Sequence, residues 1–452
     1  MRLRIFIFSL LFASSLSLLA ENLIEKPAKW DLKTCIEYAR RNNIQVQKAR
    51  ITSQENGITL EQSKKELFPS VNASGGYNLS HGENNGVSYG TSYSLGASLT
   101  LFDGFKKYNT IKQNELQKSA SELSTKETEN NITVSITQAY LQILYAHETL
   151  EMAKRTVETS KAQVELSQNL LNAGSIAKAD LSQVQAQYSS DIYTEVTAQN
   201  NYDTQKLALK QLLELDITDE LEVVFPEVDD SGALAPLPSK ATVYQTALKV
   251  MPQIQSSDFS VQAAENNLKI AKGSYYPTLS FNTGLSTSSG SSANSLLITG
   301  LNSTTQTSNA KQTYFDQLSN NLSEYLGLSL SIPIYSNGST KASVKKAKLN
   351  IQSAKLDYTS AQKELLKTVE SLYQDAVSMQ SKYNSAKEQF KYAKDSYELT
   401  KEQFKLGIKK TVDLLTQEDN YIQAEQTLLQ TKYGSVLSQK LLNFYQNIPI
   451  EL

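Results

Sequence analysis

Two aspartates are the strongest candidates for functional side chains in this chain, because each follows a glycine by six residues in a duplicated element. The first copy is Leu171-Asn-Ala-Gly174-Ser-Ile-Ala-Lys-Ala-Asp180-Leu181, and the second, 233 positions later, is Phe404-Lys-Leu-Gly407-Ile-Lys-Lys-Thr-Val-Asp413-Leu414. A glycine suits a turn between two helices, and by itself it also suits a simple helix C-cap. The aspartates suit the N-cap of a helix that follows such a turn.

Other reactive side chains are too sparse to build a catalytic centre. Cys35 is the one cysteine, and the only histidines, His81 and His147, lie 66 positions apart. This excludes an intrachain disulfide and argues against a histidine-rich metal site or a serine–histidine–aspartate triad. No G-x-x-x-x-G-K-[ST] phosphate loop is present. We therefore expect no enzyme activity and no cofactor. A net charge of −2 also gives no electrostatic reason to expect nucleic-acid binding.

The N-terminus has the features of a secretory signal. Arg2 and Arg4 precede an apolar run from Ile5 to Phe12, and small residues lead to Ala20. The alternative is a membrane anchor, but the segment from Ile5 to Ala20 is shorter than the roughly 20 residues that span a bilayer. We expect residues 1–20 to be a cleaved signal peptide.

The remainder divides into two repeats, because proline is absent from two long stretches. No proline lies between Pro69 and Pro226 or between Pro333 and Pro449, so each half can form long helices. Residues 21–225 are predicted to form the first repeat, 226–239 an inter-repeat linker and 240–452 the second repeat. Each repeat is expected to contain a helix, two strands and long helices.

The long helices are predicted from heptad seams in which apolar residues alternate by four and three. A helix from about residue 106 to 173 would be roughly 100 Å long, which implies a tube or a stalk. The first seam comprises Ile132, Ile136, Ala139, Ile143, Ala146, Leu150, Ala153, Val157, Ser160, Val164, Ser167 and Leu171. The second comprises Leu365, Val369, Leu372, Ala376, Met379, Tyr383, Ala386, Phe390, Ala393, Tyr397, Thr400 and Phe404. We interpret the aromatics as core residues that pack between antiparallel helices, not as a cofactor site.

Two segments alternate with a period of two, which predicts strand pairs at about 70–102 and 278–335. The tract from Ser286 to about Asn320, rich in Ser, Thr, Asn and Gly, is expected to be an external loop. Strands of about ten residues with one apolar and one polar face suit a transmembrane barrel. Four strands cannot close a barrel alone, so other copies must complete it, or the sheet packs on an ordinary core.

Several short motifs together resemble the outer membrane efflux protein family, typified by TolC. They recur in order in both halves and cover essentially the whole chain after residue 20. In the first half they are Trp30-Asp-Leu32 with Ala39 and Asn42-Asn43, Leu67-Phe68-Pro69 and Leu101-Phe102-Asp103-Gly104. In the second they are Ala241, Ala247 and Pro252, Tyr276-Pro277, Ile334-Tyr335-Ser-Asn337-Gly338 and the element from Gly407 to Leu414.

The resemblance implies a mostly α-helical protein with a membrane β-barrel. Three copies would share one 12-stranded outer-membrane barrel, and their coiled-coil-like helices would form an α-helical tunnel across the periplasm. Such a homotrimer is a passive exit duct in outer-membrane lipid, and it works with a periplasmic adaptor (membrane fusion) protein and an inner-membrane transporter. The family serves both drug efflux and type I secretion, and the exported substrate is not identifiable from this chain.

The resemblance also suggests roles at the periplasmic mouth, where Gly174 and Gly407 would form the tip turns. Asp413 matches an acidic constriction ring, in which three copies would attract cations. A second acid of that ring is replaced by Thr416, so the ring should be less acidic. Asp180 would help to hold neighbouring helices closed through Lys409. Lysine cannot form the bidentate pair of the usual arginine, and Phe404 replaces a hydrogen-bonding tyrosine, so the latch should be looser.

The alternative function is a secreted or periplasmic helical stalk or scaffold without channel activity. It accounts for the heptad seams but not for two amphipathic strand pairs at equivalent positions of the repeats.

Overall fold

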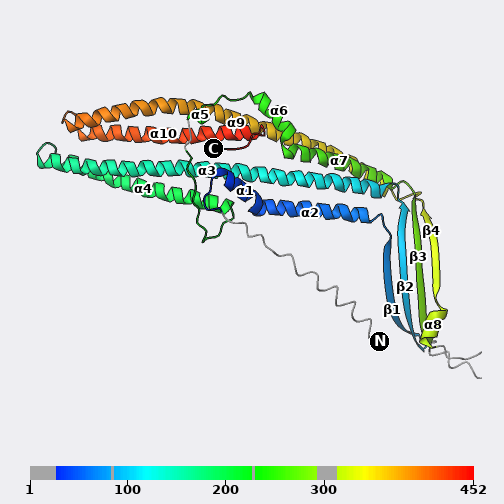
Figure 1. Cartoon of the computed structure of the whole chain (residues 1–452). Coiled ribbons are helices and arrows are strands. Elements are labelled where there is room, and N and C mark those ends of the chain that lie inside the picture. Colours follow the sequence, from blue (N-terminus) through cyan, green and yellow to red (C-terminus); the bar gives the residue numbers. More distant parts are fainter. Residues whose placement is uncertain (1–26, 83–85, 227–229, 293–312, 452) are drawn as a thin grey trace, which may run out of the picture.

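The chain forms a long bundle of helices with a curved four-stranded sheet projecting from one end (Figure 1). This computed structural model describes residues 27–82, 86–226, 230–292 and 313–451. The expected signal peptide, residues 1–20, lies outside them. Within the described residues, no helix combines the length and the apolar composition needed to cross a membrane. The predicted combination of mostly helix and four antiparallel strands is confirmed.

The two halves of the chain follow the same order of elements. The first contains α1 (Leu32–Asn42), α2 (Ile44–Lys65), β1 (Ser70–Gly82), β2 (Gly86–Phe102), α3 (Lys106–Asn172) and α4 (Lys178–Leu212). The second contains α6 (Lys240–Val250), α7 (Pro252–Gly273), β3 (Thr278–Ser292), β4 (Ser323–Ser331), α9 (Ser339–Lys405) and α10 (Thr411–Phe444). Helices α3 and α9 each have 67 residues, which makes them rods about 100 Å long.

Each rod forms an antiparallel hairpin with the helix that follows it, and the two hairpins lie side by side (Figure 1). Helix α3 pairs with α4, α9 pairs with α10, and α10 also packs on α3. All predicted seam positions on both rods are buried or half-buried. On α3 the buried surface is broader than the predicted seam and includes Tyr140, Leu141 and Leu144, because α3 lies inside the bundle and contacts several helices. Helix α9 keeps a narrow seam because it lies at the edge of the bundle.

The middle of the bundle holds the main hydrophobic core. Trp30 pairs with Val223 in a short parallel bridge, so the start and the end of the first repeat meet there. The Trp30 side chain is buried with Tyr140 and Leu144 of α3 in one cluster. The hydroxyl of Tyr140 donates to the carbonyl of Val224 at 2.6 Å, which satisfies a buried polar group.

Within the predicted linker, residues 226–239, the segment 230–239 is bound along the second hairpin. It contains one short helix, α5 (Asp230–Ala233). Lys387 of α9 forms an ion pair with Asp230 at 2.7 Å, and Ser435 of α10 donates to the last carbonyl of α5, also at 2.7 Å. The linker therefore helps to hold α9 and α10 together near the middle of the bundle.

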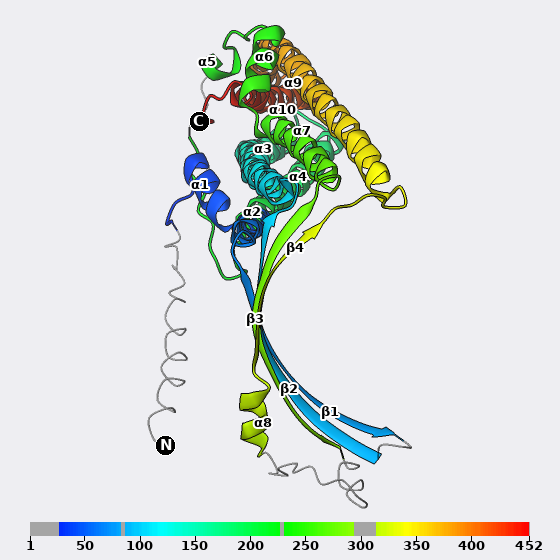
Figure 2. The same ribbon diagram turned by 90° about the vertical axis from the view of Figure 1, so that its right-hand side faces the viewer.

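The strands pair in the order β1-β2-β3-β4, each antiparallel to its neighbour. Figure 2 shows how strongly the sheet curves away from the helices. The register places apolar side chains opposite one another on one face, as in the pairs Leu95–Leu285 and Phe281–Leu328. The other face carries mainly Ser, Asn and Gly, and its serine hydroxyls pair across β1 and β2. Because β1 and β4 do not pair with each other, both are free edges in one chain.

The second strand pair differs from the prediction in three details. Strand β3 continues to Ser292, so the outer loop starts later than Ser286. Part of the expected loop forms α8 (Tyr314–Asn320), which lies against the outer part of β3. Strand β4 ends at Ser331 instead of about 335, because Pro333 cannot donate a ladder hydrogen bond.

The passage from sheet to helix requires glycine in the first repeat. Gly104, just before α3, has φ 71°, and a Cβ there would lie 2.4 Å from the carbonyl oxygen of Gly273. The equivalent Gly338, just before α9, has φ 75°, but a Cβ there would meet no neighbouring atom within 4 Å. The two positions share a left-handed backbone conformation and differ in packing.

We predict that Gly104→Ala destabilises the protein far more than Gly338→Ala. Both variants incur the left-handed backbone cost of about 1 kcal/mol, but only the first places a Cβ against the carbonyl oxygen of Gly273, the last residue of α7. Thermal unfolding of the purified variants measures the difference. Equal losses of stability would contradict the close approach of Gly104 to Gly273.

Candidate functional site

Both copies of the duplicated element form the turn of a helical hairpin, at the end of the bundle farthest from the sheet (Figure 1). Gly174 and Gly407 have φ values of 74° and 71°. The amide of Gly174 donates to Leu171, and the next amide donates to Leu170. Gly407 and its successor make the same two bonds, to Phe404 and Gln403. Each glycine therefore ends a helix in a Schellman motif, which satisfies the last carbonyl groups.

The two aspartates cap the returning helices, but from a different position than the sequence suggested. Asp180 and Asp413 are the third residues of α4 and α10, not the N-cap residues. The Asp180 carboxylate accepts from the amide of Ala177 at 3.0 Å, and that of Asp413 accepts from Lys410 at 3.3 Å. A carboxylate in the first turn also interacts favourably with the helix dipole. Both side chains stay half-exposed, so they remain available to solvent ions.

The two turns enclose a cavity of about 620 Å³. The structure brings five of the predicted site residues to it, whereas Asp413 and Thr416 lie outside it on α10. Its lining comprises Leu170, Gly174, Ser175, Ile176, Ala177, Asp180, Phe404, Gly407, Lys409, Lys410 and Thr411. Thr416 is exposed, and its hydroxyl donates to the carbonyl of Val412 at 2.8 Å.

Asp180 and Lys409 face the same cavity without forming an ion pair within the chain. Among the described residues, no nitrogen of Lys409 approaches a carboxylate within 4.0 Å. Its side chain is exposed. Contact between these two residues of different subunits stays a prediction.

Phe404 contributes apolar contact instead of a polar tether. It is 3% exposed and packs with Tyr397 and Leu414 of the same hairpin. Leu166 and Leu170 of α3 and Tyr421 of α10 complete the cluster. The tip is thus held by an apolar contact between the two hairpins of one chain.

Between this cluster and the sheet end of the bundle, polar contacts connect α3 to α10 at intervals of seven or eight residues along α3. From the sheet side toward the tip they are Tyr433 donating to Glu148 at 2.6 Å, Arg155 paired with Glu425 at 3.1 Å, and Gln163 donating to both oxygens of Glu418 at 3.0 and 3.1 Å. These three contacts form a polar ladder between the hairpins.

Glu418 is the most unusual residue of the ladder, because it is only 2% exposed. Burial raises its pKa to about 7, and the nearby carboxylates Asp191 and Asp419 raise it further. Hydrogen bonds from Gln163 and Tyr397 oppose that shift but do not cancel it. Glu418 is not among the residues predicted from the sequence, although its spacing of four from Leu414 places a charged side chain on the buried face of α10.

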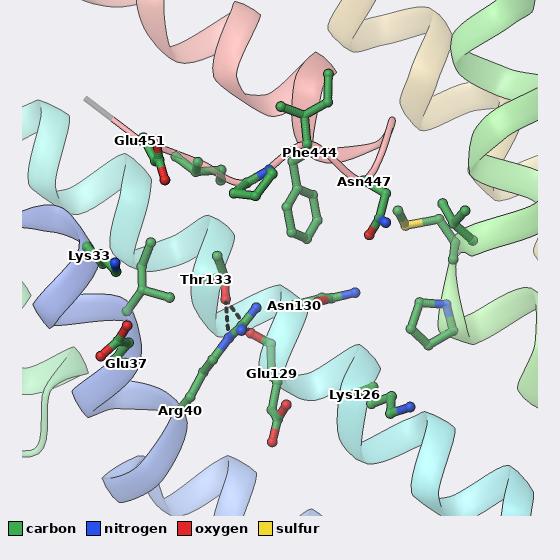
Figure 3. A pocket seen from close by; sticks show the side chains of 17 residues that line it. Lys33, Glu37, Arg40, Lys126, Glu129, Asn130, Thr133, Phe444, Asn447 and Glu451 are labelled. Carbon is green, nitrogen blue, oxygen red and sulfur yellow. Dashed lines mark hydrogen bonds between the residues drawn. The ribbon is translucent and has the colours of Figure 1, made fainter.

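A second cavity, of about 540 Å³, lies between α1, α3, the α6–α7 turn and the C-terminal segment (Figure 3). Arg40 donates from Nε to the hydroxyl of Thr133 at 3.1 Å within it. Charges of both signs line the cavity, including Lys33, Glu37 and Glu129. In the part of the chain that the structure describes, no group of three His, Cys, Asp or Glu side chains could hold a metal ion.

A two-faced sheet with open edges, continuous with two long helical hairpins, is an architecture that suits a subunit of a membrane channel. The chain belongs to the outer membrane efflux protein family, whose model matches residues 35–214 and 243–443. It is therefore an outer-membrane protein of a family of channels and not of enzymes. This assignment disfavours the secreted stalk.

Relatives and solved structures agree with the assignment. The chain is 25% identical over 323 residues to outer membrane protein TolC of Escherichia coli, covering 70% of this chain and 62% of that protein. It is 24% identical over 263 residues to the alkaline protease secretion protein AprF of Pseudomonas aeruginosa, covering 58% and 49%. The chain thus spans less than two thirds of these relatives' length.

Two solved structures show the same fold. CusC superposes with a TM-score of 0.78 at 19% identity, covering 94% of this chain and 96% of that one. The Campylobacter jejuni CmeC outer membrane channel has a TM-score of 0.72 at 18% identity, covering 92% and 86%.

We predict that Glu418→Gln makes stability less dependent on pH. Because the folded pKa is raised above the ordinary value of 4.5, the folded state binds the proton more tightly than the unfolded state. The contribution of Glu418 to the free energy of unfolding is therefore largest below about pH 4.5. It is lost as the pH rises through about 7, and the loss is about 3 kcal/mol per chain at most. Apparent melting temperatures at pH 5 and pH 8 should differ less in the variant than in the wild type.

Glu425→Gln is the matched control, since it removes an acid from the neighbouring contact of the ladder. It should leave the pH dependence close to that of the wild type. An unchanged pH dependence in Glu418→Gln would show that the buried carboxyl does not carry it.

Proposed function

We propose that three copies of this chain form the outer-membrane exit duct of a tripartite efflux or type I secretion system. An inner-membrane transporter and a periplasmic adaptor deliver the substrate, and the duct conducts it passively to the outside. Each chain contributes four strands to a shared 12-stranded barrel, and the rods form an α-helical tunnel through the periplasm. The two-faced sheet with free edges, directly continuous with the rods, is the observation that carries this proposal.

Free edges on both the sheet and the bundle support closure by identical copies. Unpaired strands β1 and β4 would meet between neighbouring subunits, and a repeated head-to-tail contact closes a ring. The apolar face of the sheet would then face lipid and the Ser, Asn and Gly face would line a watery lumen.

The outer helices of the bundle carry matching apolar positions. Ile44, Ile51 and Ile58 are exposed on α2 at intervals of seven residues, and Leu349 and Leu356 are exposed on α9 at the same interval. Such spacing suits coiled-coil contact between the α2 edge of one subunit and the α9 edge of the next.

The helical turns would form the periplasmic mouth, two from each subunit and six in the trimer. Three copies of Asp413 would create a cation-attracting constriction, weakened because Thr416 adds no charge. Asp180 of one subunit would meet Lys409 of its neighbour across the mouth. The names of relatives include both export of a protease and drug or toxin export, so we assign cargo choice to the transporter and adaptor.

We predict that both Asp413→Ala and Asp413→Asn reduce cation selectivity in planar-bilayer recordings of the purified protein. Both remove the charge, but asparagine keeps an acceptor for the Lys410 amide. The alanine variant should therefore lose about 1 kcal/mol more stability than the asparagine variant.

Thr416→Asp is the complementary gain of charge and should increase cation selectivity. If all three variants keep the selectivity of the wild type while conducting, the constriction is not at Asp413. If no variant and no wild-type protein conducts, the duct proposal itself fails.

A further inference from the structure

Lysines gather where the helices meet the sheet. Each of the four strands joins a helical segment at one end, and we consider the ten residues on the helix side of each junction. Together these four segments contain eight lysines and only three acids, which are Glu61, Glu66 and Asp103. The segments are 60–69, 103–112, 268–277 and 332–341. Helix α9 then adds three more by Lys348, and its first acid is Asp357. We call these eleven residues the junction collar: Lys64, Lys65, Lys106, Lys107, Lys112, Lys269, Lys272, Lys341, Lys345, Lys346 and Lys348.

The collar ammonium groups are not neutralised by the chain. Within the described residues, no collar lysine forms an ion pair with a carboxylate. Lys107 donates to the carbonyl of Glu66, and Lys112 lies 5.2 Å from the ring centre of Tyr108. Most of the collar side chains are exposed to solvent. The collar thus presents a ring segment of uncompensated positive charge.

Positive charge is confined to this end of the sheet. From Ser70 to Phe105 the chain contains no lysine or arginine, and from Thr278 to Thr340 it contains only Lys311. The chain as a whole has a net charge of −2. The collar is therefore a local feature and not a consequence of a basic composition.

Exposed aromatic side chains occupy the same level. They lie in or beside the four connections between strands and helices: Phe68, Phe105, Tyr108, Tyr275, Tyr276 and Tyr335, each at least 55% exposed. Tyrosine, which carries a hydroxyl on an apolar ring, prefers the headgroup region of a bilayer. Their position marks the height at which a membrane surface would meet the protein.

We propose that the junction collar binds anionic phospholipid headgroups in the leaflet nearer the helices. This rests on the proposed function, because the sheet must span a membrane to place that leaflet at the collar. Each lysine near an anionic surface adds attraction of its own, and long lysine side chains reach the headgroups from the helix ends. The collar would fix how deeply the sheet sits in the bilayer.

Native mass spectrometry of the full-length protein tests the proposal. The detergent-solubilised protein is mixed with equal amounts of phosphatidylglycerol and phosphatidylethanolamine that carry the same acyl chains. The wild type should retain about fivefold more phosphatidylglycerol at low salt. Raising the salt to about 0.5 M should reduce that preference, since screening weakens exposed charges.

The collar variant is Lys341→Gln/Lys345→Gln/Lys348→Gln, three exposed residues on one side of α9. It should lose most of the preference. A matched triple, Lys161→Gln/Lys363→Gln/Lys382→Gln, removes three exposed lysines far from the sheet and should keep it.

Equal retention of the two lipids by the wild type, or equal loss in both triples, overturns the collar proposal. Planar-bilayer conductance of the same samples separates this from the proposed function. Conducting protein without lipid preference overturns the collar alone, whereas a protein that never conducts overturns the duct and the collar with it.

Discussion

The backbone N–H and C=O groups on the outer edges of β1 and β4 have no partner strand within one chain. The rest of the structure depends on this constraint. A sheet with one apolar and one polar face is stable in a bilayer only if every edge is paired. Four strands are too few to meet that condition, and identical copies can meet it by repeating one contact. In the proposed trimer, the same rotation would arrange the rods around the same axis, so the barrel and the tunnel would share one geometry.

Duplication explains why both ends of the molecule are built from paired parts. Each repeat supplies two strands and one helical hairpin, yet the two hairpins differ in environment. Helix α3 lies inside the bundle and α9 at its edge, so both heptad seams pack within the chain, whereas α9 also keeps exposed apolar residues such as Leu349 and Leu356 outside its seam. Between the hairpins, the polar ladder and the Phe404 cluster hold the two tip turns together within one chain.

Periodic features of the sequence predicted the rods, the strands and the turns well, because heptads, alternation and glycine report directly on local geometry. Contacts between distant segments were harder to predict. The burial of Glu418 depends on Gln163, 255 positions away, and the binding of the linker depends on Lys387. The N-cap was one interpretation of the two aspartates, and the structure instead puts them at the third helical position, where they accept the same kind of amide hydrogen bond.

Disulfide cross-linking between the free strand edges tests the central claim most directly. A cysteine at Ser74 of β1 is combined in turn with one at Tyr325, Gly327 or Ser329 of β4, and the native Cys35 does not interfere because it is buried and its pKa is raised to about 12. Within one chain these edges are separated by two strands, beyond the reach of a disulfide. Closure by three copies predicts a covalent trimer on a denaturing gel for at least one pair, and exclusively monomeric protein for every pair would contradict it.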